Sequence, residues 1–220
     1  MAPAESAPPA GPPTSLIVPI FPLPDVTFFP HTFMPLHVFE ARYRALVTDA
    51  LARDRRLCVV RLLPGYERDY EGKPSVAAVA GAGEIARCER LPTGRFNILV
   101  RGLWRVRIER ELPTDTLYRV VRARRLTETP ATAEVAPTVA RIRAACGRLL
   151  KALDRPADVL DGALGAEQPL AAITDRVAAA FLPDVALRQE LLETLEVRRR
   201  AERVAAALDA LIDQLGGEAR

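Results

Sequence analysis

The chain has 220 residues, of which 49% are hydrophobic and 27% are charged, and its formal net charge at pH 7 is only +3. This length is enough to bury a full core in one large or two small domains, and no apolar run approaches the roughly 18–20 residues that cross a membrane. The three cysteines, Cys58, Cys88 and Cys146, have the spacing of neither a disulfide framework nor a zinc site, so we expect a cytoplasmic protein without a membrane association.

The first residues differ in composition from the rest of the chain. Residues 1–14 are rich in Pro, Ala and Gly and lack the basic start and apolar centre of a secretory signal. We expect a disordered lead there. The next segment, residues 16–39, combines many apolar side chains with five prolines. Because each proline fixes φ and removes a backbone donor, this segment predicts short extended pieces at the edges of a sheet.

Two strands and a helix are expected in the first quarter of the chain. The strands are predicted at 15–21 and 33–38. From Ala41 to Arg53 there is no Pro or Gly, and apolar residues recur at helical spacing. Glu40 lies where a negative charge favours the start of a helix.

The following segment, to about residue 126, is rich in predicted strands. They cover 56–63, 76–89, 96–110 and 118–123, and Pro92-Thr93-Gly94 is a turn signal between two of them. Gly81 and Gly83 predict a bulge or tight bend within their strand. One helix with many short strands is typical of a small closed barrel, which we place at residues 15–126.

The second half of the chain shows only helical patterns. After a polar boundary at 127–132, a helical subdomain is predicted over 133–216. Four amphipathic helices are expected, one of them capped by Asp184 and the last ended by Gly216-Gly217. The fold class is therefore α+β, a small β-barrel with one helix followed by an α-helical bundle.

Three segments resemble one known family. Phe-Pro-His-Thr-Phe-Met-Pro-Leu-His-Val-Phe-Glu-Ala-Arg-Tyr at 29–43, Leu-Pro-Thr-Gly-Arg-Phe-Asn-Ile-Leu-Val-Arg-Gly at 91–102 and the helical stretch 187–200 are similar to the N-terminal domain of the Lon protease family. The resemblance covers about residues 15–215. It implies a PUA-like barrel, and in Lon proteases this region is implicated in substrate recognition and hexamer assembly.

The sequence holds no recognisable catalytic machinery. The phosphate loop of an ATPase is missing, since Gly72-Lys73 is followed by Pro74, and none of the three serines lies in a nucleophile elbow. His31 and His37 with Glu40 are too few ligands for a metal centre. We therefore expect no enzymatic activity, no metal and no cofactor.

Two surfaces remain as candidate binding sites. An exposed apolar patch would bind polypeptide, and its candidates, unless they are core residues, are Phe28, Phe29, Phe33 and Met34. The alternative is an RNA-binding arginine cluster on the central hairpin, represented by Arg95, Arg101, Arg105 and Arg107. Interleaved glutamates and few aromatic residues disfavour nucleic acid.

The sequence thus predicts a non-enzymatic, bacterial Lon N-terminal-domain protein that binds unfolded protein or peptide. Its role would be substrate recognition or an adaptor function in proteolysis, with a separate ATP-dependent protease and a second copy of the chain as further partners. The alternatives are the RNA-binding module and a purely structural assembly domain.

Overall fold

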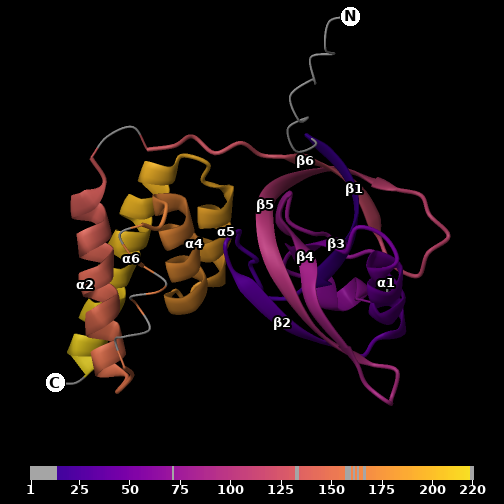
Figure 1. Cartoon of the computed structure of the whole chain (residues 1–220), viewed down its shortest axis with the longest axis horizontal. Coiled ribbons are helices and arrows are strands. Elements are labelled where there is room, and N and C mark those ends of the chain that lie inside the picture. The colour runs from indigo at the N-terminus through magenta and orange to yellow at the C-terminus, as the bar shows by residue number, and fades with distance from the viewer. Residues whose placement is uncertain are drawn as a thin grey trace, which may run out of the picture.

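In the computed structural model, the chain forms a β-barrel carrying one helix, followed by a bundle of helices beside it (Figure 1). The structure describes residues 14–70, 72–131, 134–156, 160, 162, 164–165 and 167–218, with only the backbone of 216–218. Except for Thr14, the predicted disordered lead lies outside the described residues.

Five strands close the barrel and a sixth extends it. The strands are β1 (Ser15–Leu23), β2 (Phe33–Val38), β3 (Arg56–Arg61), β4 (Val79–Arg90), β5 (Phe96–Leu112) and β6 (Val120–Arg125). Their order is β2-β5-β4-β3-β1-β6, and an additional pairing of β5 with β6 closes the ring. Strand β5 has 17 residues and is therefore long enough to pair with two strands in succession, with β2 along its first part and with β6 along its last part. Strand β2 is therefore the edge of the sheet.

One helix packs against the barrel through a core of its own. Helix α1 (Ala41–Leu51) buries Tyr43, Leu46 and Val47 against strand residues, and a short 3₁₀ helix, η1 (Tyr66–Asp69), follows β3. Glu40 occupies the N-cap position as predicted, but its carboxylate does not cap the helix. It accepts hydrogen bonds from Arg42 and Tyr70 instead.

Two glycines allow the segment between β1 and β2 to lie directly on the sheet. A Cβ on Gly81 would lie 2.0 Å from the carbonyl oxygen of Phe28, and one on Gly102 would lie 2.1 Å from that of Phe29. The backbone of residues 28–29 therefore approaches β4 and β5 at a distance that only glycine permits. The predicted bulge near Gly81 and Gly83 is also present, as a register shift between Ala82 and Gly83.

The helical half consists of α2 (Ala136–Ala152), α4 (Leu170–Phe181), α5 (Val185–Glu193) and α6 (Val197–Glu218). Asp184 caps α5 as predicted, accepting from the backbone N–H groups of Ala186 and Leu187 at 2.8 and 3.0 Å. Helix α6 continues to Glu218, past the predicted stop at Gly216, because a glycine costs a helix only about 1 kcal/mol. Among the described helices, none is long and apolar enough to span a bilayer.

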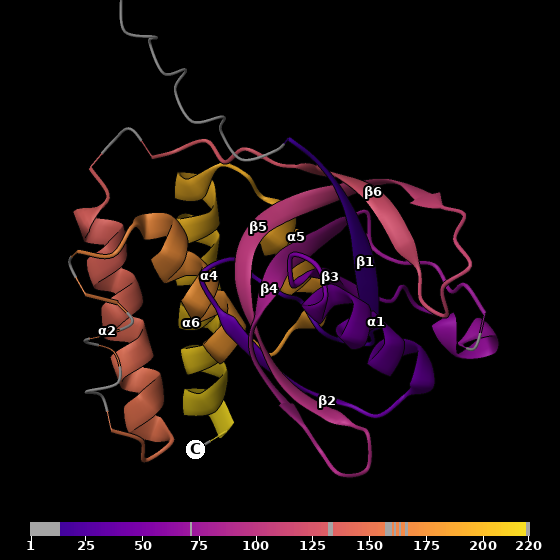
Figure 2. The same ribbon diagram turned by 45° about the vertical axis from the view of Figure 1, so that its right-hand side comes forward.

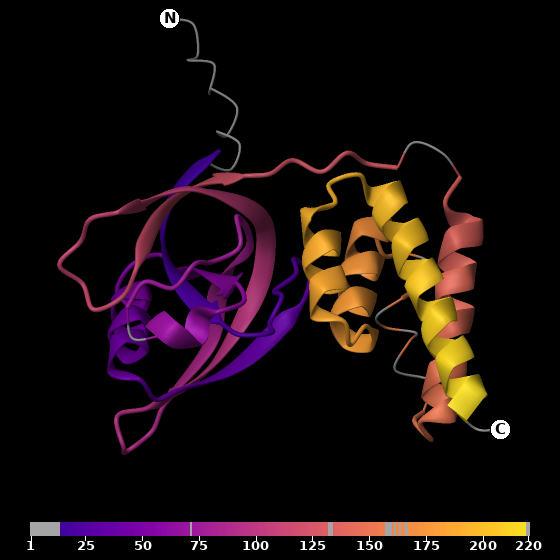
Figure 3. The same ribbon diagram turned by 180° about the vertical axis from the view of Figure 1, so that it is seen from behind.

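A buried ion cluster joins the two halves. Arg105 of β5 donates to both carboxylate oxygens of Asp175 in α4, at 2.9 and 2.5 Å, and to the carbonyl of Leu192 at 2.9 Å. Arg200 of α6 lies 3.3 Å from Asp175, and both arginines contact Glu128 of the connecting segment. Burial lowers the pKa of Arg200, and the carboxylates of Asp175 and Glu128 oppose that shift. Helices α4 and α5 lie next to the barrel, and α2 and α6 lie on the side of them that faces away from the barrel (Figure 3).

Candidate functional site

Strand β2 presents an exposed apolar row on the outside of the sheet. Side chains alternate along it, so that Phe33, Pro35 and His37 are exposed whereas Met34, Leu36 and Val38 turn inward. Phe39, directly after the strand, continues the row and stacks with His37 at a ring distance of 6.2 Å. Phe33 and Phe39 are 60% and 58% exposed, and no other Phe, Tyr or Trp side chain in the described part of the chain is exposed. We call Phe33, Pro35, His37 and Phe39 the β2 row.

The start of the β2 row borders an apolar groove. The groove has a volume of about 510 Å³ and lies between residues 31–33 and the face of α4 that carries Val177, Ala180 and Phe181. Figure 2 shows β2 extending from the helical bundle toward α1. Strand β2 pairs only with β5, so among the described strands its outer edge has no partner. An extended peptide can add to such an edge, while apolar side chains enter a neighbouring groove.

Hydrogen bonds between the barrel and the helices fix the walls of this groove. Arg176 of α4 donates to the carbonyl of His31 at 3.2 Å, immediately before β2. Arg188 of α5 donates to the carbonyl of Asp25 at 3.1 Å, and the buried Gln189 donates to that of Val79 at 3.0 Å. Together with the Arg105–Asp175 pair, these contacts hold α4 and α5 against the barrel. The groove is thus preformed, which lowers the ordering cost of binding.

The four predicted peptide-contacting residues separate into surface and core. Phe33 is exposed, and Met34 is half-buried against the core around α1. Phe28 and Phe29 are not available to a ligand, since they are 1% and 0% exposed. Phe28 packs in the core around α1, whereas Phe29 enters the core of the helical bundle, because the glycines at 81 and 102 admit their backbone to the sheet. The prediction was therefore wrong about the exposure of these two residues.

The predicted arginine cluster is divided in a similar way. Arg95, Arg101 and Arg107 are exposed, and Arg101 pairs with Glu84 at 2.6 Å. Arg105 is 1% exposed and belongs to the buried ion cluster, so its inclusion as a nucleic-acid contact was wrong. Strand alternation does turn it out of the barrel, but α4 covers it there.

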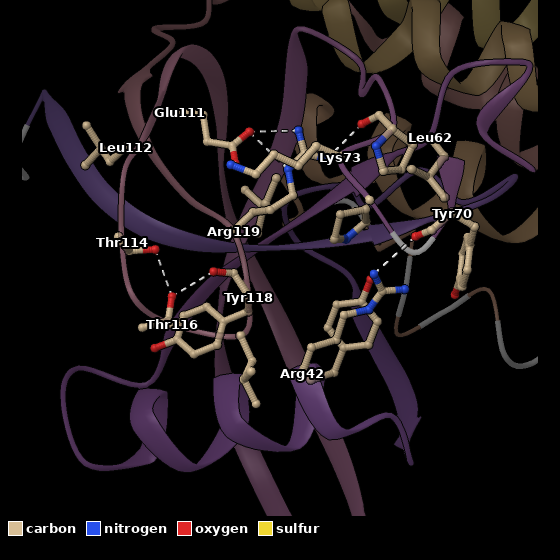
Figure 4. A pocket seen from close by; sticks show the side chains of 16 residues that line it. Arg42, Leu62, Tyr70, Lys73, Glu111, Leu112, Thr114, Thr116, Tyr118 and Arg119 are labelled. Carbon is tan, nitrogen blue, oxygen red and sulfur yellow. Dashed lines mark hydrogen bonds and ion pairs between the residues drawn. The ribbon is translucent and has the colours of Figure 1, made fainter. Parts of the chain in front are cut away.

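Sequence reasoning missed a second hollow, which we call the loop cavity (Figure 4). Its volume is about 320 Å³, and it lies among the end of β1, the start of α1, residues 62–74 and the β5–β6 connection. On one side the guanidinium of Arg42 stacks on the rings of Tyr43 and Tyr70, each at 4.9 Å, and pairs with Glu40 at 2.9 Å. No local signal marks this cavity, because four segments distant in sequence build it.

Ion pairs also define the opposite side of the loop cavity. Glu111 accepts from Arg119 at 3.1 Å and lies 3.2 Å from the ammonium of Lys73. Partial burial alone would raise the pKa of Glu111, but Arg119 and Lys73 outweigh it and hold that pKa below its usual value. Glu111 is therefore ionised at neutral pH. Burial raises the pKa of Tyr43 to about 12, so this phenol stays neutral.

The described residues contain no cluster of three or more metal-ligating side chains. The imidazole Nδ1 of His37 lies 2.8 Å from the side-chain oxygen of Asn97, and His31 adopts a left-handed backbone conformation at φ 61°. His37 is thus paired with the Asn97 amide, and His31 lies in the turn that leads into β2.

Comparison with known proteins places the chain in one family. Residues 17–210 match the family described as the ATP-dependent protease La (LON) substrate-binding domain. The chain is 25% identical over 210 residues to a Lon protease of Rhizobium meliloti, covering 94% of this chain and 25% of that relative. It is 28% identical over 209 residues to the Lon protease of Escherichia coli, covering 92% and 26%. The chain thus spans about a quarter of the length of these relatives.

Solved structures share the fold. The N-terminal domain of a Mycobacterium avium complex Lon protease superimposes with a TM-score of 0.71 at 19% identity, covering 88% of this chain and 98% of that one. A Lon N-terminal domain protein from Xanthomonas campestris gives a TM-score of 0.65 at 24% identity, covering 87% and 98%. The predicted order of a β-rich domain and C-terminal helices is confirmed. Given the family match over most of its length, the chain belongs to the Lon substrate-binding domain family.

Proposed function

We propose that this chain binds unfolded polypeptide along the β2 row and in the groove between β2 and α4. The observation that carries the proposal is Phe33, which is 60% exposed on an edge strand and borders an apolar groove of about 510 Å³. Large apolar side chains gathered at a concave surface are typical of protein-binding sites. The family description, a substrate-binding domain, supports the same reading.

The chemistry of this site suits recognition without catalysis. The groove offers apolar side chains and an open strand edge, which select for exposed hydrophobic segments of unfolded chains rather than for one sequence. We propose that the domain is non-enzymatic in itself. It would recognise substrates, or act as an adaptor, for an ATP-dependent protease encoded in a separate chain. Binding of this kind is driven by apolar burial, so added salt should weaken it little.

The test is a binding assay with the purified protein at about 50 and about 500 mM salt. The probes are a permanently unfolded, carboxymethylated polypeptide, the folded form of the same polypeptide and a short single-stranded RNA. Capture of the unfolded form alone, at both salt concentrations, is the expected result. Equal capture of the folded form, or no capture of either form, would contradict polypeptide recognition.

A specific observation keeps RNA binding as the second candidate function. Across the β5–β6 ladder Arg107 lies directly opposite Arg124, and Arg110 lies directly opposite Arg122. Like charges directly opposite each other are destabilising, and of these four only Arg124 has an acidic partner among the described residues, Glu109 at 3.5 Å. A phosphate backbone would relieve this repulsion. Of the four arginines that represented the predicted cluster, only Arg107 belongs to this one.

Salt distinguishes the two candidates. Binding that neutralises three or four phosphates on a single strand should lose about two to three powers of ten in affinity for a tenfold rise in salt. The double variant Arg107→Gln, Arg124→Gln should reduce that slope. If RNA is captured and polypeptide is not, the arginine face replaces the groove as the functional site.

A further inference from the structure

The loop cavity carries positive charge in excess of what its own carboxylates neutralise. Among its described lining residues the cations are Arg42, Lys73 and Arg119, and the carboxylate is Glu111. Glu40 pairs with Arg42 from beside the cavity. The lining itself therefore carries three cations and one carboxylate, and the nearby carboxylates of Asp49 and Asp69 accept hydrogen bonds from Tyr118 and from the backbone N–H of Lys73.

Lys73 is the cation with hydrogen-bonding capacity to spare. The guanidinium of Arg119 donates to Glu111 and to the carbonyl of Pro74, the latter at 2.8 Å. The guanidinium of Arg42 donates to Glu40 and, at 3.1 Å, to the carbonyl of Tyr70. Among the described residues the ammonium of Lys73 contacts only Glu111, at 3.2 Å, and the side chain is 72% exposed. Since an ammonium has three N–H donors, two have no partner among the described residues.

Apolar side chains supply the rest of the cavity wall. Leu62 and Leu112 line it, and Leu117 stands in the β5–β6 connection with 70% of its side chain exposed. An apolar ligand group would cover part of this exposed leucine, and removing apolar surface from water is favourable. A cation at the mouth beside apolar walls calls for a ligand with an anionic end and an apolar body.

We propose that the loop cavity binds a carboxylate carried on a small apolar body, with Lys73 pairing with the carboxylate. A carboxylate can accept a hydrogen bond from the Lys73 ammonium, whereas the carboxylate of Glu111, 3.2 Å from the same ammonium, would repel the doubly charged form of a phosphate more strongly. The volume of about 320 Å³ lies at the small end of ligand sites, about 300–1,000 Å³, which suits one terminal residue or a small acid. Two sources share this chemistry: the C-terminus of a polypeptide with an apolar last residue, and a free carboxylic acid.

This site is independent of the proposed groove, with which it shares no lining residue. Calorimetry on the full chain would use N-acetyl-leucine, a short peptide ending in leucine, and the same peptide with a C-terminal amide. A hydrogen-bonded charge is worth about 1.5–3 kcal/mol, so the acid peptide should bind about 10- to 100-fold tighter than the amide. Tight binding of the acid peptide alone identifies a polypeptide terminus, and equal binding of N-acetyl-leucine identifies a free acid; either supports the proposal.

Two variants make the test specific. Lys73→Gln should remove the preference for the acid, and its exposed position leaves folding intact. The matched control is Lys151→Gln, which changes the only other lysine, exposed on α2, and should retain the preference. Phe33→Asp should also retain it, so that failure of the groove and failure of this cavity are distinguishable. Equal binding of acid and amide, or an unchanged Lys73→Gln variant, would overturn the proposal.

Discussion

Removal of the Asp175 carboxylate should destabilise the protein more than any surface charge change. Asp175 is 0% exposed and holds Arg105, itself 1% exposed, through two hydrogen bonds at 2.9 and 2.5 Å. In Asp175→Ala the two buried arginines share one remaining carboxylate, that of Glu128. Breaking a buried pair while leaving its partner charged costs about 3–5 kcal/mol. With an m-value of about 2–3 kcal/mol/M, the urea midpoint should fall by about 1–2.5 M.

The assay is urea unfolding followed by far-ultraviolet circular dichroism, with an exposed pair as the control. Arg198 and Glu202 form an i,i+4 pair whose side chains are 57% and 52% exposed, so Glu202→Ala should change stability by only about 0.5 kcal/mol or less. A second variant, Asp175→Leu with Arg105→Met, should recover much of the loss, since it replaces buried charges by apolar groups. If Asp175→Ala behaves like Glu202→Ala, the ion cluster does not hold the barrel and helices together.

Two further predictions concern backbone packing and alkaline pH. Gly102→Ala places a Cβ about 2 Å from the carbonyl oxygen of Phe29 and should lower the free energy of unfolding by at least about 2 kcal/mol. Gly147→Ala, in open space on α2, should raise that free energy by up to about 1 kcal/mol. Denaturant midpoints test both variants, and equal shifts would refute the close approach. Burial raises the pKa of Tyr43 to about 12, and burial with a hydrogen bond to Asp49 does the same for Tyr118. In the unfolded chain these phenols lose protons near pH 10, so the unfolded state binds fewer protons and stability should fall between about pH 10 and 12; phenolate absorbance that rises fully near pH 10 without unfolding would contradict this.

Local sequence patterns predicted most of the helices and strands because these elements depend mainly on residues that are close in sequence. Strand β2 has the predicted bounds, since prolines restrict the segment around it and its alternation marks one buried face. Asp184 caps its helix because an N-cap depends only on the next three residues. The stop at Gly216 was misplaced, because glycine also tolerates helical geometry.

The remaining differences come from contacts between distant segments. Arg105 turns out of the barrel as strand alternation requires, but only the position of Asp175, 70 residues later, determines that α4 covers it. The burial of Phe28 and Phe29 depends in the same way on glycines more than 50 residues away. Gly81 was a usable signal: a glycine inside a strand indicates close approach of another backbone as well as a bulge.

The groove residues could be predicted only in part. Phe33 was among the predicted contacts, but the wall that makes it part of a groove comes from α4, which the sequence predicted only as an amphipathic helix. The spacing of apolar residues along a helix shows that one face is apolar, but it does not show which residues of that face pack in the core and which line a groove.

The most direct test of polypeptide binding at the groove compares two apolar-to-charged changes of similar exposure. Phe33→Asp alters the β2 row, and Ile17→Asp alters a residue of β1 that is 65% exposed and does not line the groove. The measurement is the dissociation constant for the carboxymethylated polypeptide, by fluorescence anisotropy. Burying a phenylalanine is worth about 1.5–3 kcal/mol, so Phe33→Asp should weaken binding by about tenfold or more, with Ile17→Asp close to the parent chain. Equal affinities for the two variants would show that the groove beside Phe33 is not the binding site.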